Sequence, residues 1–146
     1  MIAVLQRVSE ARVVNRQQLI GEINTGILVL LGIEKGDSNQ DVNFLVNKIL
    51  SLRIFNDNNG KMNFSIKDID GSVLVVSQFT LCADMKSGRR PSFSKAESPE
   101  KSNKLYECFV LMLKNNGLKV ETGKFGAMMN VELNNHGPVT FILNSK

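Results

Sequence analysis

The sequence predicts a mixed α/β fold in which a strongly curved, barrel-like β-sheet packs against two main amphipathic helices. Two observations favour this fold class. Several short segments have the continuous or alternating apolar patterns of strands, and two longer segments carry apolar residues at helical spacing. The length of 146 residues suits one hydrophobic core. We therefore expect a single domain over residues 1–146.

The first two strands and a third, central strand are predicted near the N-terminus. The opening residues alternate, which places Ile2, Val4 and Val8 on one face. The polar stretch Asn15–Gln18 then predicts a hairpin. The run Gly26–Ile33 is continuously apolar. Such a run is typical of a strand that is covered on both faces, so we expect it at the centre of the sheet.

Two helices follow from capping signals and apolar spacing. Ser38 can cap a helix, and Asp41, three residues later, can complete a capping box. The apolar residues of this helix are Val42, Leu45, Val46, Ile49 and Leu50. A second helix is predicted from Ser98-Pro99-Glu100, since serine caps, proline fits the first position and the carboxylate faces the positive end of the dipole. Its apolar residues are Leu105, Cys108, Phe109, Met112 and Leu113, and Gly117 ends it.

The remaining segments predict further strands separated by turns. Turn residues gather at three places, namely Asn56–Gly60, Asp70-Gly71 and Asn134–Gly137. The expected strands are Leu52–Phe55, Val73–Gln78, Leu118–Glu121, Ala127–Leu133 and Pro138–Leu143.

Composition narrows the classes of partner and site. The net charge of +4 favours an anionic partner such as nucleic acid, although many enzymes of small metabolites are equally basic. Cys82, Cys108 and the single histidine His136 are too few for a zinc site, so we expect no metal and no cofactor. There is no run of 18 apolar residues and no basic, apolar leader. We expect a cytoplasmic protein without membrane contacts.

Polar residues directly follow the expected strand that begins at Val73. Within Ser77–Thr80, two hydroxyls and an amide could donate hydrogen bonds to an acyl oxygen, or Thr80 could act as a nucleophile. No base stands near Thr80 in sequence. The alternative is that these residues only end a strand.

Three other segments have both a functional and a structural interpretation. The loop Lys86–Lys95 mixes cations, hydroxyls and an aromatic ring, so it could bind phosphate and stack on a base, or be a solvated loop. His136 could be a general base or an ordinary turn residue next to Gly137-Pro138, whose peptide bond could be cis. Phe125–Met129 could line an apolar pocket or pack in the core.

Seven segments together resemble the D-aminoacyl-tRNA deacylase family, in which SQFTL and GPVT are signature motifs. The likeness covers the chain from the first expected strand to the last. The segments are LQRVSEA (5–11), LLGIEKGD (30–37), LRIFND (52–57), VVSQFTL (75–81), GRRPSFSKA (88–96), ETGKFGA (121–127) and GPVTF (137–141). Cys82 stands where the family has a tyrosine, which leaves both motifs intact.

The resemblance implies roles for particular residues. Main-chain groups at the first motif would hold the aminoacyl end of tRNA, and a Gly-cis-Pro pair would reach into the pocket of a partner subunit to select chirality. Arg7 would help to hold that pair, and an aromatic and a thioether would surround the terminal adenosine. The implied site residues are Ser77, Gln78, Phe79, Thr80, Gly137, Pro138, Arg7, Phe125 and Met129.

The resemblance also implies an activity. The chain would be a homodimeric hydrolase that cleaves the ester of D-aminoacyl-tRNA and glycyl-tRNA, rejects L-aminoacyl-tRNA and relies on the 2′-hydroxyl of the tRNA itself. Two alternatives remain from the residues alone. One is an esterase of another substrate with Thr80 as nucleophile, and the other is a non-catalytic nucleic-acid-binding module that uses the loop Lys86–Lys95.

Overall fold

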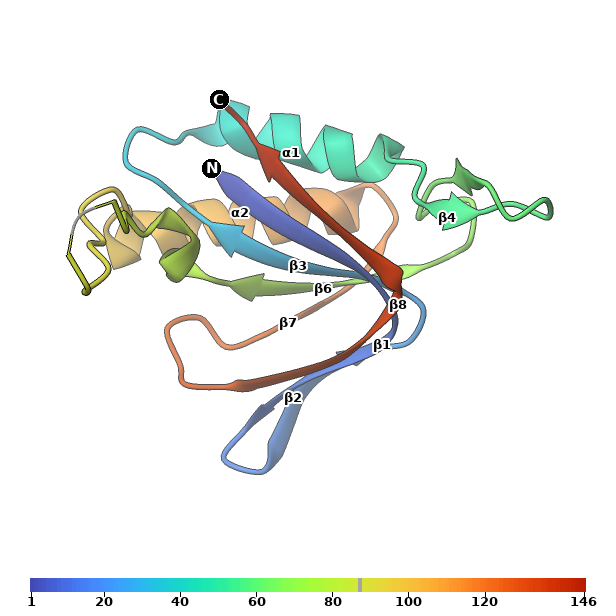
Figure 1. Cartoon of the computed structure of the whole chain (residues 1–146), viewed down its shortest axis with the longest axis horizontal. Helices are drawn as coiled ribbons and strands as arrows, with labels where there is room; N and C mark the ends of the chain where they lie inside the picture. Colours follow the sequence, from blue (N-terminus) through green and yellow to red (C-terminus); the bar gives the residue numbers. More distant parts are fainter. Residues whose placement is uncertain (87) are drawn as a thin grey trace.

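The computed structural model describes residues 1–86 and 88–146, which form one large curved sheet with helices on one side (Figure 1). The sheet order is β2-β1-β3-β6-β7, and β8 pairs with β1. Its strands are β1 (Ile2–Asn15), β2 (Gln18–Ile23), β3 (Gly26–Gly32), β6 (Ser72–Ser77), β7 (Lys119–Thr122) and β8 (Asn130–Asn144). The other elements are α1 (Asn39–Ser51), α2 (Pro99–Asn115), the short pair β4 (Phe55–Asn56) and β5 (Met62–Phe64), and the 3-10 turn η1 (Phe79–Cys82).

The sheet curves along the long strand β1, which pairs with three other strands. Its first half pairs with β3 and its second half with β2, while β8 runs antiparallel to it along nearly its whole length. The bend of the β1–β8 pair is plain in Figure 1. At the far side, β2 approaches β7 so closely that a Cβ atom on Gly21 would lie 2.7 Å from the carbonyl oxygen of Thr122. The sheet therefore nearly closes, which confirms the predicted barrel-like form.

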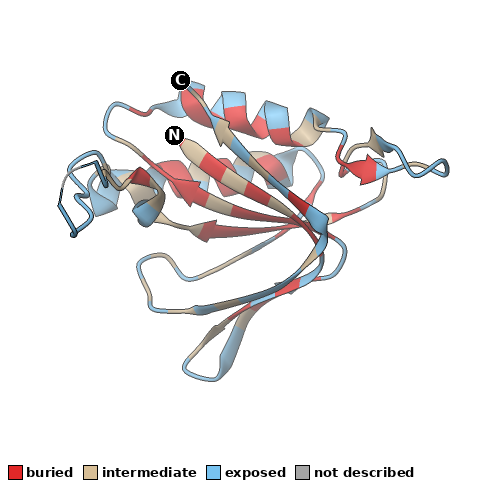
Figure 2. Cartoon of the chain, viewed as in Figure 1, coloured by how far each residue is buried: buried red, intermediate tan, exposed pale blue. Residues whose placement is uncertain are grey.

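Both faces of β3 are buried, as its continuous apolar run predicts (Figure 2). Ile27, Val29 and Leu31 face the core cluster that the two helices cover. Leu28 faces a second cluster inside the curve of the sheet, together with Leu74 of β6. The two helices lie on the same side of the sheet (Figure 1). The strands β3 and β6 are parallel, so their carboxyl ends lie at the same edge of the sheet.

Ile2, Val4 and Val8 share one face of β1, as expected, and it is the face that the helices do not cover. Ala3 and Leu5 are fully buried under the helices, whereas Ile2 and Val4 are half-buried on the opposite face. Val8 belongs to the second cluster, inside the curve. Alternation shows that two faces differ but not which one the helices cover, and that choice depends on the partners of the strand.

Other boundaries also differ from the expectation. The turn expected at Asn134–Gly137 lies inside the continuous strand β8, because pairing with β1 resumes after register shifts at Val8. Of the expected strand Leu52–Phe55 only Phe55 is in a strand, and Ala127–Leu133 becomes regular only from Asn130. The Ser38–Asp41 capping box is present, but Ser98 makes no side-chain cap although Pro99 does begin α2.

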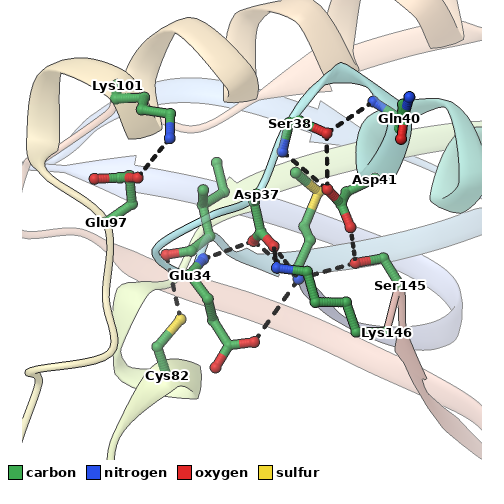
Figure 3. A network of polar contacts seen from close by, with 12 residues as sticks. Glu34, Asp37, Ser38, Gln40, Asp41, Cys82, Glu97, Lys101, Ser145 and Lys146 are labelled. Carbon is green, nitrogen blue, oxygen red and sulfur yellow. Dashed lines mark hydrogen bonds and ion pairs between the residues drawn. The ribbon is translucent and has the colours of Figure 1, made fainter.

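The two ends of the chain lie side by side and are held by a polar network at the start of α1 (Figure 3). The Met1 amine donates to Asp37 Oδ1 at 2.8 Å and to Ser145 Oγ at 3.0 Å. Ser145 Oγ donates in turn to Asp41 Oδ1 at 2.7 Å. Burial raises the pKa of Asp41, but the hydrogen bonds from Ser145 and Ser38 outweigh it and hold that pKa below its usual value. The network anchors β1 and β8 against α1.

No helix within residues 1–86 and 88–146 is long and apolar enough to cross a membrane.

Candidate functional site

A cavity of about 560 Å³ opens beyond the carboxyl end of β6. Its walls come from the ends of β3 and β6, the start of η1, the segment that leads into α2 and the segment that precedes β8. Most of its lining is apolar, including Leu31, Val76, Phe79, Phe125 and Met129. Such a cavity, with a polar end supplied by Ser77 and Gln78, is the usual form of a site for an organic ligand.

The polar end of the cavity is set by where β6 stops. Ser77 is the last residue paired with β3, opposite Leu31, and the Gln78 N–H donates to the Leu31 carbonyl at 2.8 Å. The chain then turns into η1, whose first internal hydrogen bond is from the Leu81 N–H to the Gln78 carbonyl. The N–H groups of Phe79 and Thr80 precede that bond, so the helix itself leaves them free to donate to a ligand.

The Thr80 side chain is exposed and accepts a hydrogen bond from the Gln78 amide. An amide is a donor here and cannot remove the hydroxyl proton. The cysteine that replaces the family's tyrosine, Cys82, is buried against the Ile33 carbonyl, and burial raises the pKa of its thiol to about 11. Neither side chain is therefore prepared as a nucleophile. The sequence missed η1, since four residues are too few for a periodic signal.

The opposite wall is formed by Phe125–Met129, within the segment 123–129 that leaves the sheet after β7. The Val75 carbonyl accepts the Gly123 N–H at 3.1 Å and the buried Tyr106 hydroxyl at 2.8 Å. The Lys124 N–H donates to Met129 Sδ at 3.1 Å, which folds the segment back on itself. A Cβ atom on Gly123 would lie only 3.1 Å from that sulfur. The segment is thus held in one shape beside the cavity.

Tyr106 supports the wall of the cavity, and sequence reasoning did not single it out. It lies on α2, is 5% exposed, and its ring centroid is 5.7 Å from that of Phe125. Burial raises the pKa of its hydroxyl to about 12, so it remains a neutral donor to Val75. Tyr106 joins the helix, β6 and the aromatic wall of the cavity.

Replacing Tyr106 with phenylalanine should lower the free energy of unfolding by about 1 kcal/mol, since one buried hydrogen bond is lost. If Phe125 contacts a substrate in the cavity without taking part in the chemistry, KM should rise by about 5-fold while kcat is unchanged. Urea unfolding and initial rates would measure both. A stability loss with unchanged KM would show that Tyr106 supports only the core.

Arg7 holds the Gly137-Pro138 segment in place. The guanidinium group is buried and donates from Nε to the His136 carbonyl at 2.8 Å and from Nη1 to the Ile54 carbonyl at 2.6 Å. The Gly137-Pro138 bond is cis. On the other side, the Val139 N–H donates to Asn135 Oδ1 at 2.8 Å. Gly137 and Pro138 themselves are exposed, so a firmly held piece of main chain faces outward.

Within one chain, Gly137 and Pro138 lie far from the cavity and do not line it. They face Arg7 on β1, which pairs with Ile27 of β3, whereas Ser77 pairs with Leu31. The Gly137-Pro138 segment is therefore separated from Ser77 by four residues along the strands, or about 13 Å. Across the sheet the separation is three strand spacings, or about 14 Å. The structure therefore brings Ser77, Gln78 and Phe79 of the first motif together with Phe125 and Met129. Thr80 and the second motif do not line the cavity. His136 lies with the second motif, away from Thr80.

The basic loop stands beside η1. Mutual main-chain hydrogen bonds of 2.7 and 2.9 Å join Asp84 and Ser92, and Lys95 forms an ion pair with Asp84 at 3.4 Å. The ring of Phe93 meets that of Phe79 edge-on, with centroids 4.9 Å apart. Residue 87 of this loop lies outside the described residues. Among the described residues, no group of three or more His, Cys, Asp or Glu side chains is placed to hold a metal ion.

Known proteins resemble this chain over its whole length. The family model described as D-Tyr-tRNA(Tyr) deacylase matches residues 4–144. The D-aminoacyl-tRNA deacylase of Thermosipho melanesiensis is 57% identical over 147 residues, which cover 100% of this chain and 98% of that protein. The same enzyme of Aquifex aeolicus is 55% identical, with 100% and 99% covered. A solved structure of a c-Myc DNA Unwinding Element Binding Protein has a TM-score of 0.94 and 40% identity, with 100% and 99% covered.

Proposed function

The chain belongs to the D-Tyr-tRNA(Tyr) deacylase family, and from this premise we propose how it cleaves the ester of D-aminoacyl-tRNA. The family and its curated relatives make the chain a hydrolase that edits tRNA, as the resemblance implies. The observation that carries the mechanism is the absence of a usable base among the described residues that line the cavity.

The substrate enters with its ester at the polar end of the cavity. We place the aminoacyl group at Ser77–Thr80, where the N–H groups of Phe79 and Thr80 donate to the oxyanion that develops on the carbonyl oxygen. The terminal adenosine lies against Phe125 and Met129, since an aromatic ring and a thioether suit the face of a base. This arrangement uses both walls of the cavity.

The group that assists catalysis then belongs to the substrate and not to the protein. Glu97 is the one ionisable residue among the described residues of the cavity wall. The hydrogen bond from Lys101 holds the pKa of Glu97 below its usual value, which makes it a poor proton acceptor. The 2′-hydroxyl of the terminal adenosine, next to the ester, assists the attack instead. Positioning alone can lower a barrier by about 7–11 kcal/mol, so the protein needs no base of its own.

The experiment that tests this mechanism compares Thr80→Ala with a change in the substrate. We expect Thr80→Ala to keep most of its activity on D-tyrosyl-tRNA, because the Thr80 main chain is unchanged. A tRNA that ends in 2′-deoxyadenosine should react at least about 100-fold more slowly, because a positioned acid or base usually contributes that much to the rate. Both rates are measured as release of D-tyrosine. Loss of activity in a folded Thr80→Ala protein, together with cleavage of the 2′-deoxy substrate by the wild type, would instead indicate a threonine nucleophile.

We also propose that Gly137 and Pro138 complete the cavity of a second subunit. Their exposure, their anchoring by Arg7 and their distance from the cavity of their own chain support this arrangement. A two-fold axis makes the exchange reciprocal, so one interface completes two sites. The main chain of this pair stands against the substrate Cα and leaves room only for hydrogen on that side. Glycine has hydrogen on both sides, so glycyl-tRNA is also a substrate.

A further inference from the structure

A second cavity, of about 490 Å³, lies on the other side of the segment that walls the first. It is bounded by the turn that joins β1 to β2 and by residues 124–130. Ala127, Met128 and Met129 line both cavities. A ligand that extends past Met129 would therefore pass from one cavity into the other.

The second cavity is built from fixed parts. Asn15 Nδ2 donates to the Met128 carbonyl at 2.9 Å and ties the hairpin to the wall. Val14 of β1 pairs with Asn130 of β8, and Met129 Sδ accepts the Lys124 N–H. Both sides of the cavity are therefore held by hydrogen bonds within the chain.

The charge of this cavity is positive. Arg16 and Lys124 are the ionisable residues among its described lining, and neither forms an ion pair within the part of the chain that the structure describes. Two exposed cations facing one cavity favour an anionic ligand.

Arg16 also occupies an unusual backbone position. Arg16 and Gln17 have φ of +46° and +69°, the left-handed conformation that a two-residue hairpin turn needs and that glycine or asparagine adopts most easily. A large cation therefore stands where the backbone prefers a small residue. Such outliers concentrate at functional sites.

We propose that this second cavity binds the phosphate that joins the last two nucleotides of the tRNA 3′ end. The inference rests on the proposed function, in which the terminal adenosine lies against Phe125 and Met129. The strand leading into that nucleoside then crosses the shared wall, and its phosphate meets Arg16 and Lys124. The binding is to a single-stranded phosphodiester and is independent of base sequence.

The test uses the double variant Arg16→Gln/Lys124→Gln and substrates with and without the phosphate. On D-tyrosyl-tRNA we expect KM to rise about 10-fold at low salt. The slope of log(kcat/KM) against log salt should become shallower by about 0.7 for one neutralised phosphate. A comparable rise in KM at low salt is expected with D-tyrosyl cytidylyl-adenosine, which keeps the one phosphate. With D-tyrosyl-adenosine, which has none, double variant and wild type should have equal kcat/KM.

Matched controls separate this site from general charge. Lys67 is exposed and precedes β6, whereas the first cavity lies beyond the other end of that strand. Lys67→Gln should therefore leave KM and the salt slope unchanged. Arg16→Lys/Lys124→Arg keeps both charges and should restore KM. Equal losses on D-tyrosyl cytidylyl-adenosine and D-tyrosyl-adenosine, or an unchanged salt slope, would overturn the phosphate subsite while the deacylase activity stands. A wild-type protein that released no D-tyrosine from tRNA would overturn the proposed function and this inference with it.

Discussion

The protein is expected to hydrolyse D-tyrosyl-tRNA at least about 100-fold faster than L-tyrosyl-tRNA, a difference of about 3 kcal/mol. The proposed wall is main chain that Arg7 and Asn135 hold on both sides, so it cannot turn aside as a side chain would. An L side chain would collide with it, whereas the hydrogen of a D-amino acid or of glycine would not. Release of each amino acid from matched tRNAs measures the ratio. Comparable rates for the two enantiomers would contradict the proposal that this main chain excludes an L side chain.

A Gly137→Ala variant tests the same wall from the protein side. The added Cβ would lie 2.5 Å from Val139 Cγ2 and 2.7 Å from the Val139 nitrogen, so the segment has to shift. We expect activity on D-tyrosyl-tRNA and the D/L ratio both to fall by about 10-fold or more, while Gly137 is too exposed for a large loss of stability. Gly60→Ala is the control for backbone strain, because its φ is +75° but nothing lies within 4 Å of a Cβ atom there, so it should cost stability without changing activity or the D/L ratio.

Mixing variants tests whether the wall comes from a second subunit. A homodimer of Gly137→Ala alone or of Phe125→Ala alone has both of its sites damaged. Suppose that each site combines Phe125 of one subunit with Gly137 of the other. After random exchange, half of the dimers are mixed and each has one intact site, so about a quarter of all sites should recover wild-type activity. No recovery after verified exchange would place both residues in the site of one subunit.

Arg7→Met is expected to lower the free energy of unfolding by about 3 kcal/mol. The variant removes hydrogen bonds from a charged donor, and the loss of each costs about 1.5–3 kcal/mol. The His136 and Ile54 carbonyls would lose their bonds to the guanidinium, and the Gly137-Pro138 segment would lose its anchor. Activity should therefore fall even in the fraction that stays folded. Urea unfolding measures the first effect, and rates at a temperature where the variant is fully folded measure the second.

Arg12→Met is the matched control on the same strand. Arg12 pairs with Glu132 of β8 at 2.6 Å, but both side chains are about half exposed. Exposed ion pairs contribute little, because water and salt screen them. We expect only a small change in stability and none in activity. If Arg7→Met were as mild as Arg12→Met, the anchoring role of Arg7 would be wrong.

The sequence by itself determined the features that depend on neighbouring residues. The Ser38–Asp41 capping box, the buried central strand after Gly26 and the start of α2 at Pro99 all follow from local hydrogen bonding or apolar periodicity. The two motifs likewise identified the family, because each is a short contiguous segment. The separation of those motifs in space had no signal of this kind.

Only the tertiary structure decided the features that depend on contacts between distant residues. The face of β1 that is buried depends on the helices that cover Ala3 and Leu5, and the continuity of β8 through Gly137 depends on its pairing with β1. The structure shows that Arg7 reaches the His136 carbonyl, 129 residues away. It also shows that Arg16 and Lys124 line one cavity that neither segment forms alone. Such contacts follow from how the curved sheet closes, and no pattern within one segment of the chain records that closure.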